Sequence, residues 1–202
     1  MESTAKRPRR GSTKLTLCIC GMAGSGKSTA AKRIARKYGL HYYSGGDALK
    51  ELALETGLKG GETGWWESEE GMRFLKKRAH DLSFDKKVDE KLLKRAEKGN
   101  VVLDSWAMPW LLPEGFKVWL EASHEERAHR AARRDGITVE RAQAALKEKD
   151  ACTREIFRRL YGFSLGEDFS PFDLILDVDQ LGPDEVFRAL VQVIDRLVLA
   201  SP

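Results

Sequence analysis

One segment of the sequence combines glycines, a lysine and hydroxyl residues in a spacing that suits phosphate binding. The pattern G-x-x-x-x-G-K-[ST] is matched by Gly21, Met22, Ala23, Gly24, Ser25, Gly26, Lys27 and Ser28, and Thr29 follows it. Glycines allow a tight turn that gathers backbone N–H groups around an oxyanion, and a helix N-terminus adds partial positive charge. Lys27 then reaches the β- and γ-phosphates, and the Ser28 hydroxyl can ligate Mg²⁺. The segment predicts a site for a nucleoside triphosphate.

The elements expected around this loop are a buried strand before it and a helix after it. Residues 15–20 form a short apolar run, and residues 27–38 follow a helical pattern. Further strands are predicted at 41–43, 101–104, 116–120 and 173–176. Further helices are predicted from Asp47, over 69–82 and 84–98, over 124–161 with an interruption at Gly136, and from Pro183, with a loop at 57–68. Short strands alternating with helices predict an α/β fold with a five-stranded parallel sheet and helices on both faces.

An acidic residue is expected close to the phosphates. Asp104 ends the predicted strand 101–104. In open α/β sheets the ligand crevice lies beyond the carboxyl ends of the strands. Asp104 is thereby placed to hold magnesium and its waters together with Ser28. The alternative is that Asp104 caps a turn that begins at Ser105 and Trp106.

A basic stretch covers residues 124–161, which carry ten Lys or Arg against seven Asp or Glu. Arg127, Arg130 and Arg134 lie on one helical face by the i, i+3, i+7 rule. Phosphoryl transfer needs such charge, because negative charge spreads over the transferred group. We interpret the segment as a closing lid. For any single arginine the alternative, a solvated helix with i,i+4 ion pairs, is favoured.

Composition and charge narrow the class of protein. The chain has 202 residues, of which 42% are hydrophobic and 33% are charged, as in one soluble domain. No run approaches the roughly 18 apolar residues of a membrane helix. The net charge of +4 resides in residues 1–14, whereas the other 188 residues carry 30 positive and 30 negative charges. We expect a disordered basic tail over 1–13 and one domain over 14–202, and the neutral body argues against a nucleic-acid partner.

Three cysteines, Cys18, Cys20 and Cys152, lack the spacing of a zinc site. Cys18 and Cys20 alternate in an apolar run, so both are expected in the core rather than on a metal. This usage predicts a reduced, cytoplasmic protein.

Beyond the loop at 21–28, several segments resemble one family. They are Ser44-Gly-Gly-Asp47, Gly99-Asn-Val-Val-Leu-Asp104 with Trp110 downstream, Lys117-Val-Trp-Leu-Glu-Ala122 followed by Glu126-Arg127, Arg134-Asp-Gly-Ile-Thr-Val-Glu140, Tyr161-Gly162 and Phe172-Asp-Leu-Ile175. In order and spacing, residues 15–194 resemble the nucleoside monophosphate kinases, most closely the archaeal-type cytidylate kinases.

The resemblance implies a P-loop kinase three-layer fold with a helical acceptor-binding part at about 44–100 and a lid at about 134–160. It implies ATP and Mg²⁺, and transfer of the γ-phosphoryl group to CMP or dCMP, by a monomer or weak dimer without a membrane partner. The catalytic residues would be Lys27, Asp104, Arg130, Arg134, Lys149 and Arg154. The acceptor would contact Ser44, Gly46, Asp47, Lys50, Trp106 and Trp110.

The sequence departs from the family at the acceptor side. Lys50 stands where the family has an arginine that grips the acceptor phosphate, and lysine lacks the bidentate fork. The family's E-G-R is here Asp104-Ser105-Trp106, so that a second arginine becomes a tryptophan. In the lid, Lys149 and Ile156 replace family residues, with Arg154 and Arg158 nearby. The tryptophans of this region form either an aromatic platform or core packing; they are Trp65, Trp66, Trp106 and Trp110.

Three functions are compatible with these observations. The first is a nucleoside monophosphate kinase, in which the acceptor phosphate is itself the nucleophile. The second is a kinase of the same fold with another small acceptor, and for a hydroxyl acceptor Asp104 or Asp47 would serve as base. The third is a nucleotide-binding regulatory protein that touches RNA through its tail.

Overall fold

The computed structural model describes residues 14–59 and 64–198, and the expected tail at 1–13 lies outside them. Five parallel strands form the sheet in the order β2-β3-β1-β4-β5. Their bounds are Thr16–Cys20 for β1, His41–Ser44 for β2, Val101–Asp104 for β3, Phe116–Glu121 for β4 and Leu174–Asp177 for β5. The predicted five-stranded parallel sheet is confirmed, with strand ends that differ from the expected ones by at most one residue.

Helices connect the strands and cover both faces of the sheet. They are α1 (Lys27–Tyr38), α2 (Gly45–Glu55), the 3₁₀ turn η1 (Trp65–Glu67), α3 (Glu69–His80), α4 (Ser83–Ala96), α5 (Met108–Leu111), α6 (His124–Asp135), α7 (Val139–Tyr161), α8 (Pro183–Val193) and a π-helical turn η2 (Ile194–Val198). The predicted helices are confirmed. The short α5 and the turn η1 carry too few residues for a periodic pattern and were not predicted, whereas the π-helical turn η2 continues the helix that was predicted from Pro183.

Alternation along the strands gives the sheet two buried faces. Leu17 and Ile19 of β1 pack with Ile34 of α1 and Leu190 of α8 on one face. On the other face Cys18 and Cys20 join a cluster with residues of α2, α4 and α5. Burial raises the pKa of the Cys20 thiol. These two cysteines are therefore core residues, as predicted.

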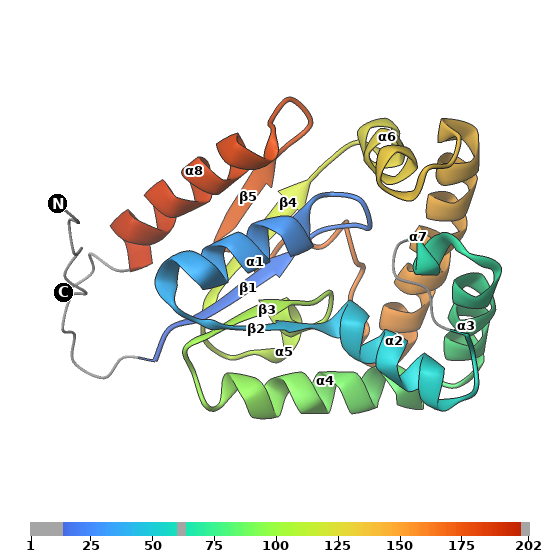
Figure 1. Cartoon of the computed structure of the whole chain (residues 1–202). Helices are drawn as coiled ribbons and strands as arrows, with labels where there is room; N and C mark the ends of the chain where they lie inside the picture. Colours follow the sequence, from blue (N-terminus) through green and yellow to red (C-terminus); the bar gives the residue numbers. More distant parts are fainter. Residues whose placement is uncertain (1–13, 60–63, 199–202) are drawn as a thin grey trace, which may run out of the picture.

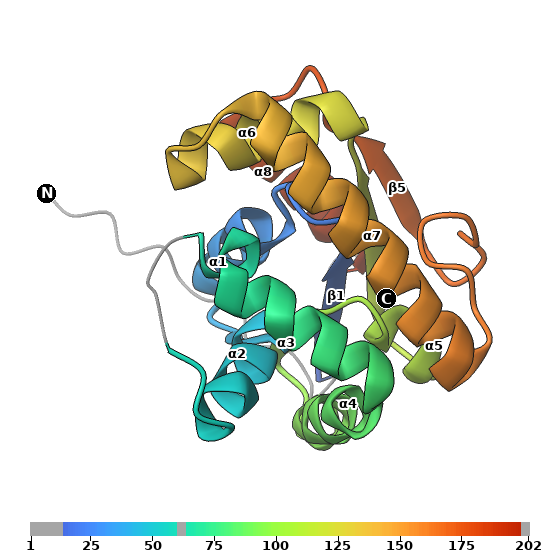
Figure 2. The same cartoon turned by 90° about the vertical axis from the view of Figure 1, so that its right-hand side faces the viewer.

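Helices α3, α6 and α7 gather beyond the carboxyl ends of the strands (Figures 1 and 2). There α6 packs on α7, and α7 packs on α3. Gly136, with φ of 66°, ends α6, and the Thr138 hydroxyl accepts a hydrogen bond from the Arg141 N–H at the start of α7. The predicted interruption at Gly136 is thus a helix end and a new cap. Among the described residues, no helix is long and apolar enough to span a membrane.

Candidate active site

The loop between β1 and α1 takes a conformation that glycine makes accessible. Gly24 has φ of 85°, and a Cβ built there would lie 2.8 Å from the carbonyl oxygen of Arg127. Helix α1 begins at Lys27, and its N-cap residue Gly26 supplies no side-chain hydrogen bond. The N-terminus of α1 is therefore open to an anionic ligand.

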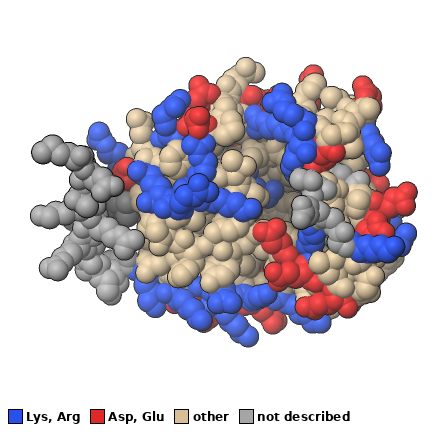
Figure 3. Space-filling model, viewed as in Figure 1, with Lys and Arg blue, Asp and Glu red and all other residues tan. Residues whose placement is uncertain are grey.

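A cavity of about 630 Å³, the larger cavity, opens beside this loop. Its walls come from the loop and α1, from α6, and from the segment that leads into α8. The lining residues are Gly24, Ser25, Gly26, Lys27, Ser28, Thr29, Ala30, Glu126, Arg130, Ala131, Arg133, Arg134, Asp179, Gln180, Leu181, Gly182, Pro183 and Val186. Figure 3 shows Lys and Arg side chains along α1 and over α6.

Ser25 gives this cavity an unmet polar group. Its residue is 2% exposed, and its Oγ has no hydrogen-bond partner among the described residues. A buried hydroxyl without a partner costs free energy that a ligand oxygen would recover. The loop, the open helix end and this hydroxyl together fit the phosphates of a nucleotide.

A second cavity of about 180 Å³, the smaller cavity, lies on the other side of the loop. It is lined by residues of the loop, α2, α4, the end of β3 and α7. They are Ala23, Gly24, Lys27, Ser28, Ser44, Gly45, Gly46, Asp47, Leu49, Trp66, Asp85, Val88, Asp89, Asp104, Ser105, Trp106, Arg134, Lys149 and Phe157.

Four residues line both cavities: Gly24, Lys27, Ser28 and Arg134. Two ligands that fill the two cavities would therefore meet at the N-terminus of α1. Arg134 comes from the C-terminal end of α6, where its guanidinium pairs with Asp135 at 2.6 Å. A site with this geometry brings two small molecules together at one set of positive groups.

Asp104 lies at the carboxyl end of β3, which pairs with β1, and it lines the smaller cavity with Ser28. The residue is 3% exposed, and the Tyr42 hydroxyl donates a 2.9 Å hydrogen bond to its Oδ2. Burial and the nearby Asp104 carboxyl raise the pKa of Tyr42. Tyr42 thereby holds the carboxyl at the cavity wall. Ser28 and Asp104 are oxygen ligands of the kind that suits Mg²⁺ when phosphates complete its shell.

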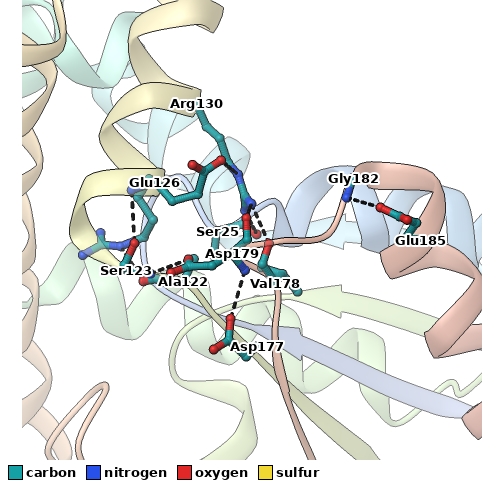
Figure 4. Close-up of polar contacts among 11 residues, drawn as sticks. Ser25, Ala122, Ser123, Glu126, Arg130, Asp177, Val178, Asp179, Gly182 and Glu185 are labelled. Atoms are coloured by element: carbon teal, nitrogen blue, oxygen red, sulfur yellow. Dashed lines mark hydrogen bonds and ion pairs between the residues drawn. The ribbon is translucent and has the colours of Figure 1, made fainter.

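Arg130 connects three parts of the larger cavity (Figure 4). Its guanidinium pairs with Glu126 at 2.9 Å and donates to the carbonyl oxygens of Val178 at 2.6 Å and Ser25 at 3.4 Å. Asp179, next to Val178, adds a second connection to the start of α6, because its Oδ1 accepts a 2.7 Å hydrogen bond from the Ser123 N–H. Helix α6 is thus tied to the loop and to the segment after β5.

Arg127, on the same face of α6 as predicted, has a different environment. It is 5% exposed, donates to the carbonyl oxygen of Ala23 at 3.0 Å and pairs with Asp150 of α7 at 2.8 Å. Arg127 lines neither cavity in the described part of the chain. It joins the loop to both helices of the predicted lid.

The two lid residues predicted from α7 lie in different places. Lys149 lines the smaller cavity, with its ammonium 5.1 Å from the Trp66 ring centroid. Arg154 donates through Nε to the carbonyl oxygen of Leu165 at 3.1 Å and lines neither cavity within the described residues. The structure therefore brings Lys149, and not Arg154, to the smaller cavity.

The residues predicted to bind the acceptor are also divided. Ser44, Gly46 and Asp47 line the smaller cavity, where the Ser44 hydroxyl caps α2 by accepting from the Asp47 N–H at 3.0 Å. Over the residues described, Lys50 and Trp110 line neither cavity. The Lys50 ammonium lies 5.8 Å from the Trp65 ring centroid. Trp110 stacks on Phe163 at 3.9 Å and donates to Asp168 at 2.9 Å, so it belongs to the core packing.

Trp106 lies between the loop and the smaller cavity. Its indole N–H donates to the carbonyl oxygen of Gly21 at 2.9 Å, and its ring meets Phe157 edge-on. The Lys27 ammonium lies 5.3 Å from the Trp106 ring centroid. The tryptophan thereby contacts the loop lysine directly, through a cation–π interaction.

The acidic residues of α4 at the smaller cavity were not among the residues predicted from the sequence. Asp85 and Asp89 line the smaller cavity and are almost fully buried. Asp85 pairs with the buried Arg78, and Asp89 accepts a hydrogen bond from Tyr161. Asp85 and Asp89 are four residues apart and therefore lie on one face of the helix, together with Val88. This spacing was the only sign in the sequence that the two carboxyls act together.

Comparisons with known proteins agree with this geometry. A cytidylate kinase of Pyrococcus horikoshii is 32% identical over 185 residues, which are 91% of this chain and 90% of the relative. A cytidylate kinase of Ignicoccus hospitalis is 34% identical over 183 residues, which are 90% of this chain and 97% of the relative.

Solved structures share the fold. A shikimate kinase from Bacteroides thetaiotaomicron aligns with a TM-score of 0.56 at 16% identity, over 92% of this chain and 99% of that one. A shikimate kinase from Acinetobacter baumannii aligns with a TM-score of 0.55 at 17% identity, over 93% of this chain and 96% of that one. The model of the cytidylate kinase-like family matches residues 16–180. The chain therefore has the α/β fold of P-loop kinases and belongs to the cytidylate kinase-like family.

Proposed function

We propose that this protein is a kinase that transfers the γ-phosphoryl group of ATP to CMP or dCMP in the presence of Mg²⁺. The observation that carries the proposal is the shared wall of Gly24, Lys27, Ser28 and Arg134 between the two cavities. The two relatives described above are cytidylate kinases by name, which supports CMP as the acceptor.

In this proposal ATP occupies the larger cavity and the acceptor the smaller one. The ATP phosphates contact residues 21–29, and the adenosine extends toward α6 and residues 179–183. The acceptor lies among residues of the acceptor-binding part, 44–100, and the lid, 134–160, closes over both.

The chemistry then consists of positioning and charge neutralisation. Lys27 and Arg134 border both cavities and so lie beside the group in transit. Mg²⁺, held by Ser28, Asp104 and the phosphates, would neutralise charge on the phosphate oxygens. The acceptor phosphate attacks in line, so no side chain has to remove a proton. Positive groups near the acceptor phosphate include Lys149, which lines the smaller cavity.

Two arginines of the predicted catalytic set have positioning roles in this proposal. Arg130 bonds main-chain oxygens of Ser25 and Val178 and keeps the larger cavity in shape. Arg154 bonds the main chain of Leu165 and holds the segment after α7. Neither role requires contact with the transferred group.

The test is ADP release by purified protein with Mg-ATP and a panel of acceptors. The panel contains CMP, dCMP, UMP, AMP, free nucleosides and sugars. CMP-dependent ADP release is expected, and Lys27→Ala should lower kcat by roughly 10²–10³-fold, as loss of one preorganised cationic donor does. Lys37→Ala, an exposed lysine at the other end of α1, is the control and should leave kcat unchanged.

Other results would replace the proposal by one of its alternatives. Turnover with a sugar or nucleoside but with no monophosphate would indicate a kinase for a different small acceptor. ATP binding without turnover for any acceptor would indicate a regulatory nucleotide-binding protein. A Lys27→Ala variant as active as the Lys37→Ala variant would overturn the assignment of the site.

The setting of the enzyme is part of the proposal. Cys18, Cys20 and Cys152 are free thiols, which favours the reducing environment of the cytoplasm. The proposed active unit is a monomer or weak dimer, as the resemblance to the nucleoside monophosphate kinases implies. Light scattering at several protein concentrations measures the molar mass in solution and hence the oligomeric state.

A further inference from the structure

Helix α4 contributes two acidic side chains to the lining of the smaller cavity. Asp85 and Asp89 lie four residues apart on one face of the helix, with Val88 on the same face, and all three line the cavity. Asp85 is 2% and Asp89 5% exposed. Buried carboxyls require partners, and each of these has one from a different helix.

Arg78 of α3 holds the Asp85 carboxyl in a bidentate pair. Its Nε and Nη2 donate to Oδ2 at 3.1 Å and Oδ1 at 2.6 Å. Arg78 is completely buried, and its Nη1 has no hydrogen-bond partner among the described residues. The pair orients the carboxylate and leaves one guanidinium donor unmet beside it.

Tyr161 of α7 holds the Asp89 carboxyl, because its hydroxyl donates to Oδ2 at 2.8 Å. Burial and the charge of Asp85 raise the pKa of Asp89 to about 7, although Tyr161 and Arg78 act in the opposite direction. Asp89 therefore exists near neutral pH in both forms, and its protonated form carries an O–H donor.

Other residues of the lining are aromatic, apolar or cationic. Trp66, Leu49 and Phe157 line the cavity together with the two carboxyls. Lys27 and Ser28 of the phosphate loop line the same cavity. The cavity thus combines cationic groups that suit a phosphate with two carboxyls and with aromatic side chains that suit a planar ring.

We propose that Asp85 and Asp89, held by Arg78 and Tyr161, recognise the amino edge of the acceptor's base and so select cytosine over uracil. This inference rests on the kinase function proposed above. Carboxylates accept hydrogen bonds from the exocyclic amine of cytosine. Uracil presents a carbonyl oxygen at the same position, which places an acceptor against the carboxylate.

A second position of the cytosine ring also matches the carboxyls of this cavity. The ring nitrogen N3 of cytosine is an acceptor, and the protonated form of Asp89, which lines the cavity, is a donor. In uracil N3 is a donor and O4 is an acceptor, so both positions differ from those of cytosine. The two carboxyls therefore favour cytosine over uracil at the exocyclic amine and at N3.

The first experiment uses the unaltered protein, so it does not depend on the folding of a variant. kcat/KM is measured for CMP, for UMP and for the CMP analogue that lacks the 4-amino group, 2-pyrimidinone ribonucleoside 5′-monophosphate. The loss of a base-edge contact is expected to lower kcat/KM by about 10- to 100-fold for the analogue. Equal values for CMP and the analogue would overturn the proposal.

The second experiment tests the residues. Asp89→Asn keeps the size of the side chain but can present either an amide N–H or an oxygen to the base, so the kcat/KM ratio of CMP to UMP should fall at least tenfold. Glu90→Gln makes the same chemical change at the neighbouring, exposed position and should leave the ratio unchanged. The affinity for ATP, measured by titration calorimetry, should be the same in all three proteins.

The failure of this inference differs from the failure of the proposed function. Turnover of CMP with an unaltered CMP-to-UMP ratio in Asp89→Asn overturns the base recognition and leaves the kinase intact. Absence of turnover with every monophosphate in the unaltered protein overturns the proposed function itself.

Discussion

The two cavities that meet at the phosphate loop are built in different ways. The larger cavity owes its loop wall to backbone geometry, with the open N-terminus of α1 and glycines such as Gly24 at positive φ. The smaller cavity is built from side chains of α2, α4, α7 and the end of β3. Backbone N–H groups bind phosphate whatever the neighbouring side chains are, whereas a cavity made of side chains changes with each substitution.

This difference agrees with the expectation from the resemblance that the sequence departs from its family on the acceptor side. The loop at 21–28 keeps the full G-x-x-x-x-G-K-[ST] pattern, and the departures at Lys50 and Trp106 remain a prediction. Trp106 lines the smaller cavity and contacts the loop, whereas Lys50 lies near Trp65. The phosphate-gripping charge at the acceptor side is therefore expected from Arg134 and Lys149, which line the smaller cavity.

The largest expected effect concerns a buried charge of the smaller cavity. The pKa of Asp89 is raised to about 7 from 3.8, so the folded protein binds more protons than the unfolded chain between these values. Its contribution to stability is present at low pH and is lost as the pH rises through 7. Between pH 5 and pH 8 this loss is about 3 kcal/mol of unfolding free energy.

Denaturant unfolding at pH 5 and pH 8 measures this loss, with Asp89→Asn as the partner that does not titrate. The asparagine variant should gain stability relative to the unaltered protein as the pH rises. Arg78, Asp85 and Tyr161 face Asp89 in both proteins, so their own titration largely cancels in the comparison. If the free energy of unfolding changed with pH in the same way in both proteins, the result would contradict a raised pKa at Asp89.

The next largest effect is the loss of stability expected when a glycine in the loop of the larger cavity is replaced. Gly24→Ala requires a positive φ from alanine and places Cβ 2.8 Å from the Arg127 carbonyl oxygen. Gly26→Ala is the matched control, because its φ is 91° but a Cβ there meets nothing within 4 Å. Strain alone costs about 1–3 kcal/mol. Both variants should lose stability, and Gly24→Ala should lose more; an equal loss would show that the contact with Arg127 relaxes freely.

The fold could be predicted from the sequence because most of its signals are local. Four of the five strands are short apolar runs, β2 (His41–Ser44) being the exception, and the loop motif fixes where β1 ends and α1 begins. The loop wall of the larger cavity follows from that motif for the same reason. The elements that the pattern missed, α5 and the turn η1, are too short to show a period.

The smaller cavity could be predicted only in part, because its walls depend on long-range packing. Asp85 and Asp89 lie in a helix rich in lysine, where two acids at i and i+4 are typical of a solvated face. Their burial results from Arg78 and Tyr161 on other helices. For Trp110 the sequence left open an aromatic platform at the acceptor or core packing, and in the structure it stacks on Phe163.

The smallest expected effect concerns Trp106, which lines the smaller cavity and contacts the loop that borders both cavities. Trp106→Phe keeps an aromatic ring beside Lys27 but removes the indole N–H that bonds the Gly21 carbonyl oxygen. Loss of one such hydrogen bond costs about 1 kcal/mol. Trp110→Phe is the matched control, since it removes an indole hydrogen bond to Asp168 outside both cavities as the structure describes them. Both variants should lose similar thermal stability, but only Trp106→Phe should alter KM, for ATP and for CMP together, because the loop borders both ligands. An altered KM in both variants, or in neither, would mean that Trp106 supports the fold without connecting the two cavities.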